Sequence, residues 1–300
     1  MRVSVCFDIK TPDGLTLRGR RWLPGSTERR ARAVLVHGVG EHSGRYDEVA
    51  GVMTRLGIEV VGYDQRGFGA SQGKRGEIPS DMTLVSDAVC VFDLVRRECP
   101  ADPPPFLVAH SMGGTIAAYA VATGLIAPRG LALSSPAVAP RITDLEEQAL
   151  RLLLPGLPNV PLDSGIKPSQ VTRDPTEQKK IKADKRMHTT VTPRLVLAIL
   201  DQGRATFRKA GKIRVPTILL VAGSDLVVDH DTTLQFFARM RPEVRTLHLY
   251  RRLFHEVFNE LPADRKKVFA AFDRWLRRQL GVSKAGRQGH TRDAFTVQSR

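Results

Sequence analysis

The chain has 300 residues and carries 46 Lys and Arg against 31 Asp and Glu, a formal net charge of +15. Hydrophobic residues make up 42%, which permits a sizeable core and excludes an intrinsically disordered chain. No apolar run reaches membrane-spanning length, and the N-terminus lacks the long apolar segment of a signal peptide. The three cysteines, Cys6, Cys90 and Cys99, have no metal-ligand spacing. We therefore expect a cytoplasmic protein without a metal site.

The surplus of positive charge leaves two interpretations open. The basic residues are spread along the chain, which favours an ordinary solvated surface. The same charge would attract an anionic membrane, so weak peripheral association with such a surface is the alternative. Aromatic residues are not interleaved with the basic ones in a base-stacking pattern, and we expect no specific nucleic-acid partner.

The first half of the chain alternates between predicted strands and helices. Two strands over residues 3–10 and 15–22 flank the turn sequence Thr-Pro-Asp-Gly. Short buried strands follow, separated by segments with helical periodicity, at residues 33–36, 58–63, 106–109 and 130–134. This alternation predicts an α/β fold with a mostly parallel, doubly wound sheet.

One turn between a strand and a helix predicts a nucleophile. The sequence Ala109-His110-Ser111-Met112-Gly113 differs from the pattern G-x-S-x-G only at Ala109. A serine at the apex of so tight a turn projects from the edge of the sheet, and the N–H of the next residue points to where an oxyanion forms. Ser111 is the candidate nucleophile and Met112 a candidate oxyanion-hole residue. The alternative is an ordinary turn with a surface serine.

The loop over residues 37–46 predicts the second half of the oxyanion hole. It follows a buried strand and reads His-Gly-Val-Gly-Glu-His-Ser-Gly-Arg-Tyr. Its glycines allow the backbone to approach a ligand closely, so the N–H of Val39 is the expected partner of the Met112 N–H. His37 and His42 lack the spacing of a metal site, and we expect them to stiffen the loop through hydrogen bonds.

The alternation stops between residues 136 and 208. Amphipathic segments over 145–154 and 194–200 are separated by proline-rich turns. We interpret this insertion as a helical cap over the sheet edge, with the core formed by residues 1–135 and 209–280. The apolar stripes of the cap either pack against the core or line a substrate channel. The sequence alone assigns no individual substrate-binding residue within 136–208.

Two further strands place a carboxylate and a histidine at the same sheet edge. Asp225 follows a buried strand over 215–222, and His255 follows a strand over 244–250. A serine nucleophile needs a base, and the base needs a group that orients it. We therefore predict a catalytic triad of Ser111, His255 and Asp225. Asp229 is the rival of Asp225, and the rivals of His255 are His110, His188, His230 and His248.

The C-terminal residues complete the predicted architecture. Residues 262–280 read as a long helix that covers the sheet. Residues 281–300 are polar and basic, and we expect a disordered tail.

These motifs resemble the monoacylglycerol lipase and lysophospholipase branch of the α/β-hydrolase superfamily, over roughly residues 10–280. Residues 37–46 are similar to its oxyanion segment H-G-x-G-E-H-S-G-R-Y, residues 64–71 to its D-x-R-G-x-G-x-S loop, residues 110–114 to its H-S-M-G-G elbow and residues 254–260 to its histidine segment. The resemblance implies an eight-stranded sheet, with the cap inserted after the sixth strand. It also implies hydrolysis of a single-chain lipid ester, a monoacylglycerol or a lysophospholipid, without a cofactor.

Two departures from this branch bear on activity and substrate. Ala109 replaces the first glycine of the elbow, and residues 183–189 are more basic than the branch would predict, which favours an anionic headgroup. The alternatives are a broader carboxylesterase, a serine aminopeptidase and a non-catalytic binding protein on the same fold. A dehalogenase or an epoxide hydrolase would carry an aspartate at the elbow, so Ser111 argues against both.

Overall fold

A nine-stranded sheet forms the centre of the molecule. The computed structural model describes residues 4–25, 28–282 and 295–298, the last segment by its backbone alone. The strand order is β1-β2-β4-β3-β5-β6-β9-β10-β11. The pairs β1/β2 and β2/β4 are antiparallel, and the other pairs are parallel. The strands up to β10 are β1 (Ser4–Lys10), β2 (Thr16–Trp22), β3 (Ala31–Val36), β4 (Ile58–Tyr63), β5 (Phe106–His110), β6 (Leu131–Ser134), β9 (Thr217–Ala222) and β10 (Arg245–Tyr250).

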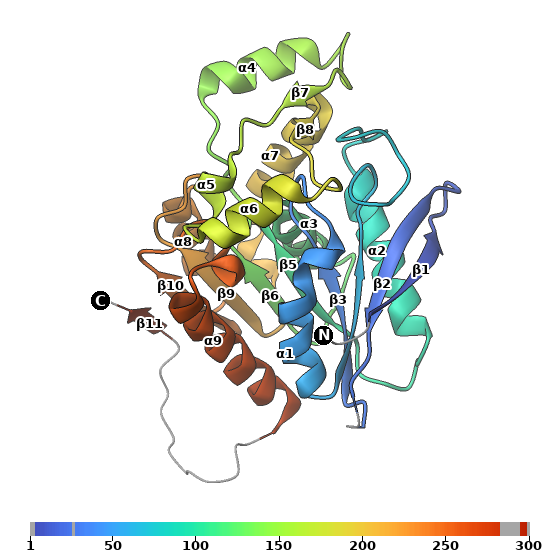
Figure 1. Ribbon diagram of the computed structural model, residues 1–300, viewed down its shortest axis with the longest axis vertical. Helices are drawn as coiled ribbons and strands as arrows, with labels where there is room; N and C mark the ends of the chain where they lie inside the picture. Colours follow the sequence, from blue (N-terminus) through green and yellow to red (C-terminus); the bar gives the residue numbers. More distant parts are fainter. Residues whose placement is uncertain (1–3, 26–27, 283–294, 299–300) are drawn as a thin grey trace.

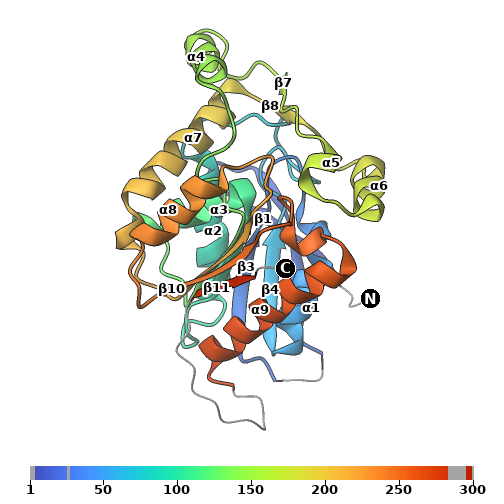
Figure 2. The same ribbon diagram turned by 90° about the vertical axis from the view of Figure 1, so that its left-hand side faces the viewer.

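The central strands are continuous apolar runs because helices cover both faces of the sheet. Every residue of β3, β4, β5, β6 and β9 is buried. The helices α1 and α9 cover one face, and α2, α3, α7 and α8 cover the other (Figure 2). The predicted doubly wound α/β fold is confirmed. These helices are α1 (Asp47–Arg55), α2 (Thr83–Arg97), α3 (Ser111–Ala122), α7 (Pro193–Arg208), α8 (His230–Arg239) and α9 (Pro262–Leu280).

The insertion after β6 lies above the carboxyl ends of the parallel strands (Figure 1). Its last helix, α7, differs from the rest because it runs along α3 and buries Leu195, Ala198 and Ile199 in the same apolar cluster as the sheet. The boundary of the cap at residue 208 therefore stays a prediction. The smaller elements of the insertion are α4 (Asp144–Leu153), β7 (Leu162–Asp163), α5 (Pro168–Val171), α6 (Pro175–Ala183) and β8 (Thr190–Val191).

Three single-turn 3-10 helices complete the described elements at η1 (Ser43–Tyr46), η2 (Ala210–Lys212) and η3 (Val257–Asn259). None of the helices in the described ranges is both long enough and apolar enough to cross a bilayer.

The C-terminal segment adds one strand to the sheet. The eight expected strands are present, and a ninth, β11 (Phe295–Gln298), pairs in parallel with β10, with Leu247 opposite Phe295. The sequence Phe-Thr-Val-Gln at residues 295–298 favours this strand, although the polar sequence around it predicts a disordered tail, and the tail as a whole stays a prediction. Residues 283–294 and 299–300 lie outside the described residues, so the prediction is untested there.

Candidate active site

The turn between β5 and α3 holds Ser111 in a conformation that few residues adopt. Ser111 has φ 52°, in the left-handed region that is costly for a residue with a side chain. Gly113 allows the turn to form, because a Cβ atom there would clash with the carbonyl oxygens of Val36 and His37. Ala109 has an ordinary negative φ and is buried in the apolar core. Its methyl group is therefore compatible with the turn.

The three predicted triad residues lie together. The Nε2 atom of His255 lies 2.8 Å from Ser111 Oγ, and its Nδ1 atom lies 2.8 Å from Asp225 Oδ2. The other oxygen of Asp225 accepts the N–H groups of Val227 and Val228 at 2.8 and 2.9 Å. All three triad side chains are buried. This is the geometry of a hydroxyl, a base and an orienting carboxylate.

The pKa shifts agree with this arrangement. Burial lowers the pKa of His255, but the Asp225 carboxylate, together with Glu256 and Glu41, leaves the pKa above its ordinary value. Burial raises the pKa of Asp225, but His255 and two backbone N–H groups leave it below its ordinary value. Asp225 is therefore ionised at neutral pH and favours the protonated form of His255.

The rival residues have other places in the structure. Asp229 caps α8 through the N–H and hydroxyl of Thr232. The Nδ1 atom of His110 lies 3.0 Å from the carbonyl oxygen of Ser134. His188 stacks on Phe68 with a ring separation of 4.9 Å. The remaining rivals, His230 at the start of α8 and His248 in β10, are not among the residues that line the triad's pocket.

His37 fixes the peptide that carries the Val39 N–H. The backbone N–H of Gln65 donates to Nε2 of His37 at 2.8 Å, so the proton of the neutral ring lies on Nδ1. That Nδ1–H donates to the carbonyl oxygen of Gly38 at 2.7 Å. Because the peptide is planar and trans, this bond directs the Val39 N–H to the opposite side. Burial lowers the pKa of His37 and keeps the ring neutral.

Met112 lies in the first turn of α3, where backbone N–H groups have no partner within the helix. The oxyanion roles of Val39 and Met112 stay predictions. The predicted stiffening of the loop by His37 is confirmed, and His42 extends it, because its Nε2 atom lies 2.8 Å from Asp184 in the cap. Among the described residues, no group of three or more His, Cys, Asp or Glu side chains is placed to hold a metal ion.

Two backbone hydrogen bonds fasten the cap to the loops that carry the site. The N–H of His188 donates to the carbonyl of Gly40 at 3.1 Å, and the N–H of Glu256 donates to the carbonyl of Val171 at 2.8 Å. The first joins the cap to the loop of Val39, and the second joins it to the loop of His255.

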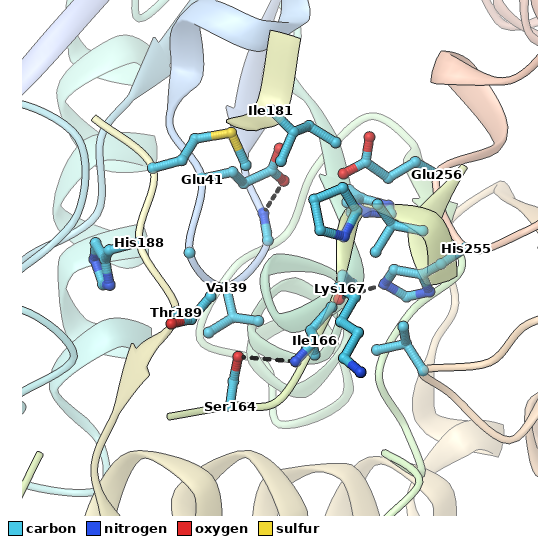
Figure 3. Close-up of a pocket in the computed structure, with 18 of the residues that line it drawn as sticks. Val39, Glu41, Ser164, Ile166, Lys167, Ile181, His188, Thr189, His255 and Glu256 are labelled. Atoms are coloured by element: carbon cyan, nitrogen blue, oxygen red, sulfur yellow. Dashed lines mark hydrogen bonds between the residues drawn. The ribbon is translucent and has the colours of Figure 1, made fainter. Parts of the chain in front are cut away.

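A pocket of about 210 Å³ lies between the triad and the cap. Figure 3 shows Glu41 and Glu256 on one side of it, with Ile166 and Lys167 on the other. The cap also contributes Lys182. The apolar side chains of the lining are Val39, Ile166, Val171, Ile181, Met187 and Val227.

The sequence analysis missed the charged residues of this pocket. Glu41 belonged to a recognised motif and Glu256 follows His255, yet neither was assigned a role. A signal for Glu41 is present in the sequence, because Glu41 and Arg45 are four residues apart and can form an ion pair. Lys167 and Lys182 carried no signal, since their positions depend on how the cap folds.

Comparison with known proteins places this arrangement in a family. The family described as serine aminopeptidase S33 matches residues 27–262. The chain belongs to this family. It is 30% identical to a monoacylglycerol lipase of Mycolicibacterium smegmatis, over 91% of this chain and 93% of the relative. It is 29% identical to human monoglyceride lipase, over 90% of each chain.

A solved structure and a longer relative extend the comparison. The monoacylglycerol lipase of Paleococcus ferrophilus superposes with a TM-score of 0.79 at 28% identity, over 88% of this chain and 99% of that one. An uncharacterized abhydrolase domain-containing protein of Dictyostelium discoideum is 29% identical, but the chain spans only 30% of its length. The α/β-hydrolase fold and the resemblance predicted from the sequence are confirmed.

Proposed function

We propose that this protein is a serine hydrolase that cleaves the carboxylic ester of single-chain lipids, with Ser111 as nucleophile, His255 as general base and Asp225 as the orienting group. The observation that carries the proposal is the buried chain of two 2.8 Å contacts from Asp225 through His255 to Ser111. The similarity to monoacylglycerol lipases over most of the chain supports it.

The proposed reaction follows from these contacts. His255 Nε2 accepts the hydroxyl proton as Ser111 Oγ attacks the ester carbonyl, and the N–H groups of Val39 and Met112 stabilise the oxyanion. The tetrahedral intermediate collapses when His255 protonates the leaving alcohol, which leaves an acyl-enzyme on Ser111. Water, deprotonated by His255, then releases the fatty acid and restores the serine.

An ester substrate fits the pocket better than a peptide with a free amino group. An aminopeptidase needs an anionic partner for the substrate ammonium. The carboxylates that line this pocket are those of Glu41 and Glu256, and both bind Arg45. The mostly apolar remainder of the pocket suits an acyl chain.

Two features support activity on anionic lipids, namely two lysines in the pocket and the positive charge of the whole protein. Lys167 and Lys182 line the pocket from the cap, and neither forms an ion pair with another described residue. Arg186, which made residues 183–189 look basic, is paired with Asp184 instead. We propose that the pocket accepts lysophospholipids with anionic headgroups, and that the net charge of +15 assists approach to anionic lipid surfaces.

The experiment compares wild type with Ser111→Ala on p-nitrophenyl esters and monoacylglycerols of increasing chain length. We expect hydrolysis by wild type, its loss in the variant, and labelling of wild type alone by a fluorophosphonate. A folded wild-type protein that cleaves no ester and takes no label would contradict the proposal.

A further inference from the structure

Three buried charged side chains connect the loops on either side of the triad. Arg45 Nη1 donates to Glu41 at 2.8 Å and to Glu256 at 2.7 Å, and its Nη2 donates to the other oxygen of Glu256 at 2.7 Å. The exposed fractions of the three side chains are 10% for Arg45, 4% for Glu41 and 8% for Glu256. A forked guanidinium that holds two carboxylates away from water fixes their relative positions.

Glu41 transmits this constraint to the oxyanion loop. Its Oε1 atom accepts the backbone N–H of Gly38 and the hydroxyl of Tyr46, each at 2.5 Å. Gly38 directly precedes Val39 and is tightly enclosed, because a Cβ atom there would lie 2.9 Å from Glu41 Oε1 and 3.1 Å from Ser111 Cβ. A shift of the Glu41 carboxylate would therefore move the Gly38 turn relative to Ser111.

Glu256 transmits the constraint to the catalytic base. It follows His255 in the chain, and its Oε2 atom also accepts the side-chain amide of Asn259 at 2.9 Å. The carboxylate and the backbone of Glu256 are both bound, so Arg45 and the cap together hold the loop of His255. The Arg45 fork is thus a direct link between the Val39 loop and the His255 loop.

The cluster also carries a net charge of −1, because two carboxylates share one guanidinium. Burial raises the pKa of both carboxyl groups, and the positive charge of Arg45 is the largest of the effects that lower it. The result is a pKa of about 2 for Glu41 and a pKa below the ordinary value for Glu256, so both are ionised. Both carboxylates act on His255 in the same direction as Asp225, toward a higher pKa. The charged or titratable groups around His255 are Asp225, Glu256, Glu41, Arg45, His110 and Lys167.

We propose that Arg45 and Glu256 are positioning residues, which align the Val39 N–H with Ser111 and His255 through Glu41. The surplus negative charge of the cluster of Glu41, Arg45 and Glu256 favours the imidazolium formed during catalysis. This inference rests on the proposed function. A remote structural ion pair would stabilise the fold without affecting the titration of His255.

The test is the pH profile of ester hydrolysis by Glu256→Gln, which keeps the side-chain shape and removes the charge. We expect kcat to fall about tenfold with KM within about twofold of wild type, since the contacts act on the transition state. Loss of the negative charge lowers the pKa of His255, so the acid limb of kcat/KM moves to lower pH. Glu256→Asp keeps the charge and is expected to restore the position of that limb while kcat stays reduced.

Asp87→Asn is the matched control, because it also removes one buried carboxylate that holds an arginine. Arg66 is also a buried fork, held by Asp87 through two bonds of 2.9 Å and by Asp13, but it does not line the pocket. We expect the control to lower the melting temperature without moving the acid limb.

An unchanged profile and kcat in folded Glu256→Gln would overturn the inference, and so would a control that shifts the limb equally. If Glu256→Gln fails to fold, Arg45→Lys decides, because it keeps the charge but loses the fork. We expect a lower kcat there, and a wild-type kcat would overturn the inference. Fluorophosphonate labelling of wild-type Ser111 separates these results from failure of the proposed function, which would abolish labelling and turnover in every form.

Discussion

His255 receives opposing influences from its surroundings. Burial disfavours its charged form, whereas Asp225 and two glutamates favour it, and the balance raises its pKa above the ordinary value. Only the neutral ring can accept the proton of Ser111. The proposed base is therefore expected to be inactivated as pH falls through the raised pKa, which would give hydrolysis an acid limb.

Asp225→Asn tests this balance. Loss of the carboxylate removes the main influence that raises the pKa of His255, so the acid limb of kcat/KM is expected to move to lower pH. The expected kcat is about 10⁴ times lower, as in other triads that lose the orienting carboxylate. The measurement is hydrolysis of a soluble ester from about pH 5 to about pH 9. An acid limb that stays at the wild-type pH would show that another group controls the titration.

A second prediction for a single residue concerns Ala109. It lies in β5, paired with Val36 and Leu133, with no positive φ that would require glycine. Ala109→Gly, which restores the usual motif, is expected to cost roughly 0.5–1 kcal/mol of stability. Calorimetry should show a melting temperature about 1–2 °C lower, and ester assays a kcat within about twofold of wild type. A large gain in kcat would mean that the methyl group distorts the elbow.

Single residues with chemical signatures were the predictable part of the site. Ser111 and Asp225 follow the buried apolar strands β5 and β9, and His255 follows the half-buried strand β10, so the sheet topology brings them to one edge. Lys182 could not be placed this way, because α6 is positioned by long-range contacts with no sequence periodicity to reveal them. The strand Phe295–Gln298 could not be predicted for a related reason, because four residues give too short a pattern to outweigh the polar sequence around them.

The helix α6 carries the exposed lysines Lys179 and Lys182, whose charges can be reversed one at a time. Lys182 lines the pocket, whereas Lys179, one turn earlier and also exposed, does not. For Lys182→Glu, we expect the ratio of KM for an anionic lysophospholipid to KM for a neutral monoacylglycerol to rise about three- to tenfold. The reason is that an exposed charge contact contributes up to ~1 kcal/mol. Lys179→Glu changes the net charge equally, and we expect no change in that ratio.

The comparison of the two lysine variants separates local from global charge. Equal effects on KM would indicate that only the charge of the whole protein matters. No change in either variant would contradict the anionic-headgroup proposal and leave ester hydrolysis itself intact.

Over the whole molecule, the charge of +15 predicts electrostatic attraction to anionic membranes. We expect cosedimentation with phosphatidylglycerol-containing vesicles at about 0.05 M salt, and its loss at about 0.5 M as the Debye length shrinks. Vesicles of phosphatidylcholine alone are the control and should not retain the protein. Binding that survives high salt would instead implicate the exposed leucines of the cap region, Leu145, Leu152 and Leu157.

Two of the bonds that fasten the cap, from His188 to Gly40 and from Glu256 to Val171, end on the same loops that carry Val39 and His255. A cap that lifts to admit substrate must release one or both loops. If lipid enters by such lifting, the conformation that exchanges it with the surroundings is not the one that performs chemistry, and each catalytic cycle would include an assembly step and a disassembly step. An acyl chain too long to be enclosed would hold the cap ajar and occupy the enzyme without reacting, so such a lipid would act as an inhibitor.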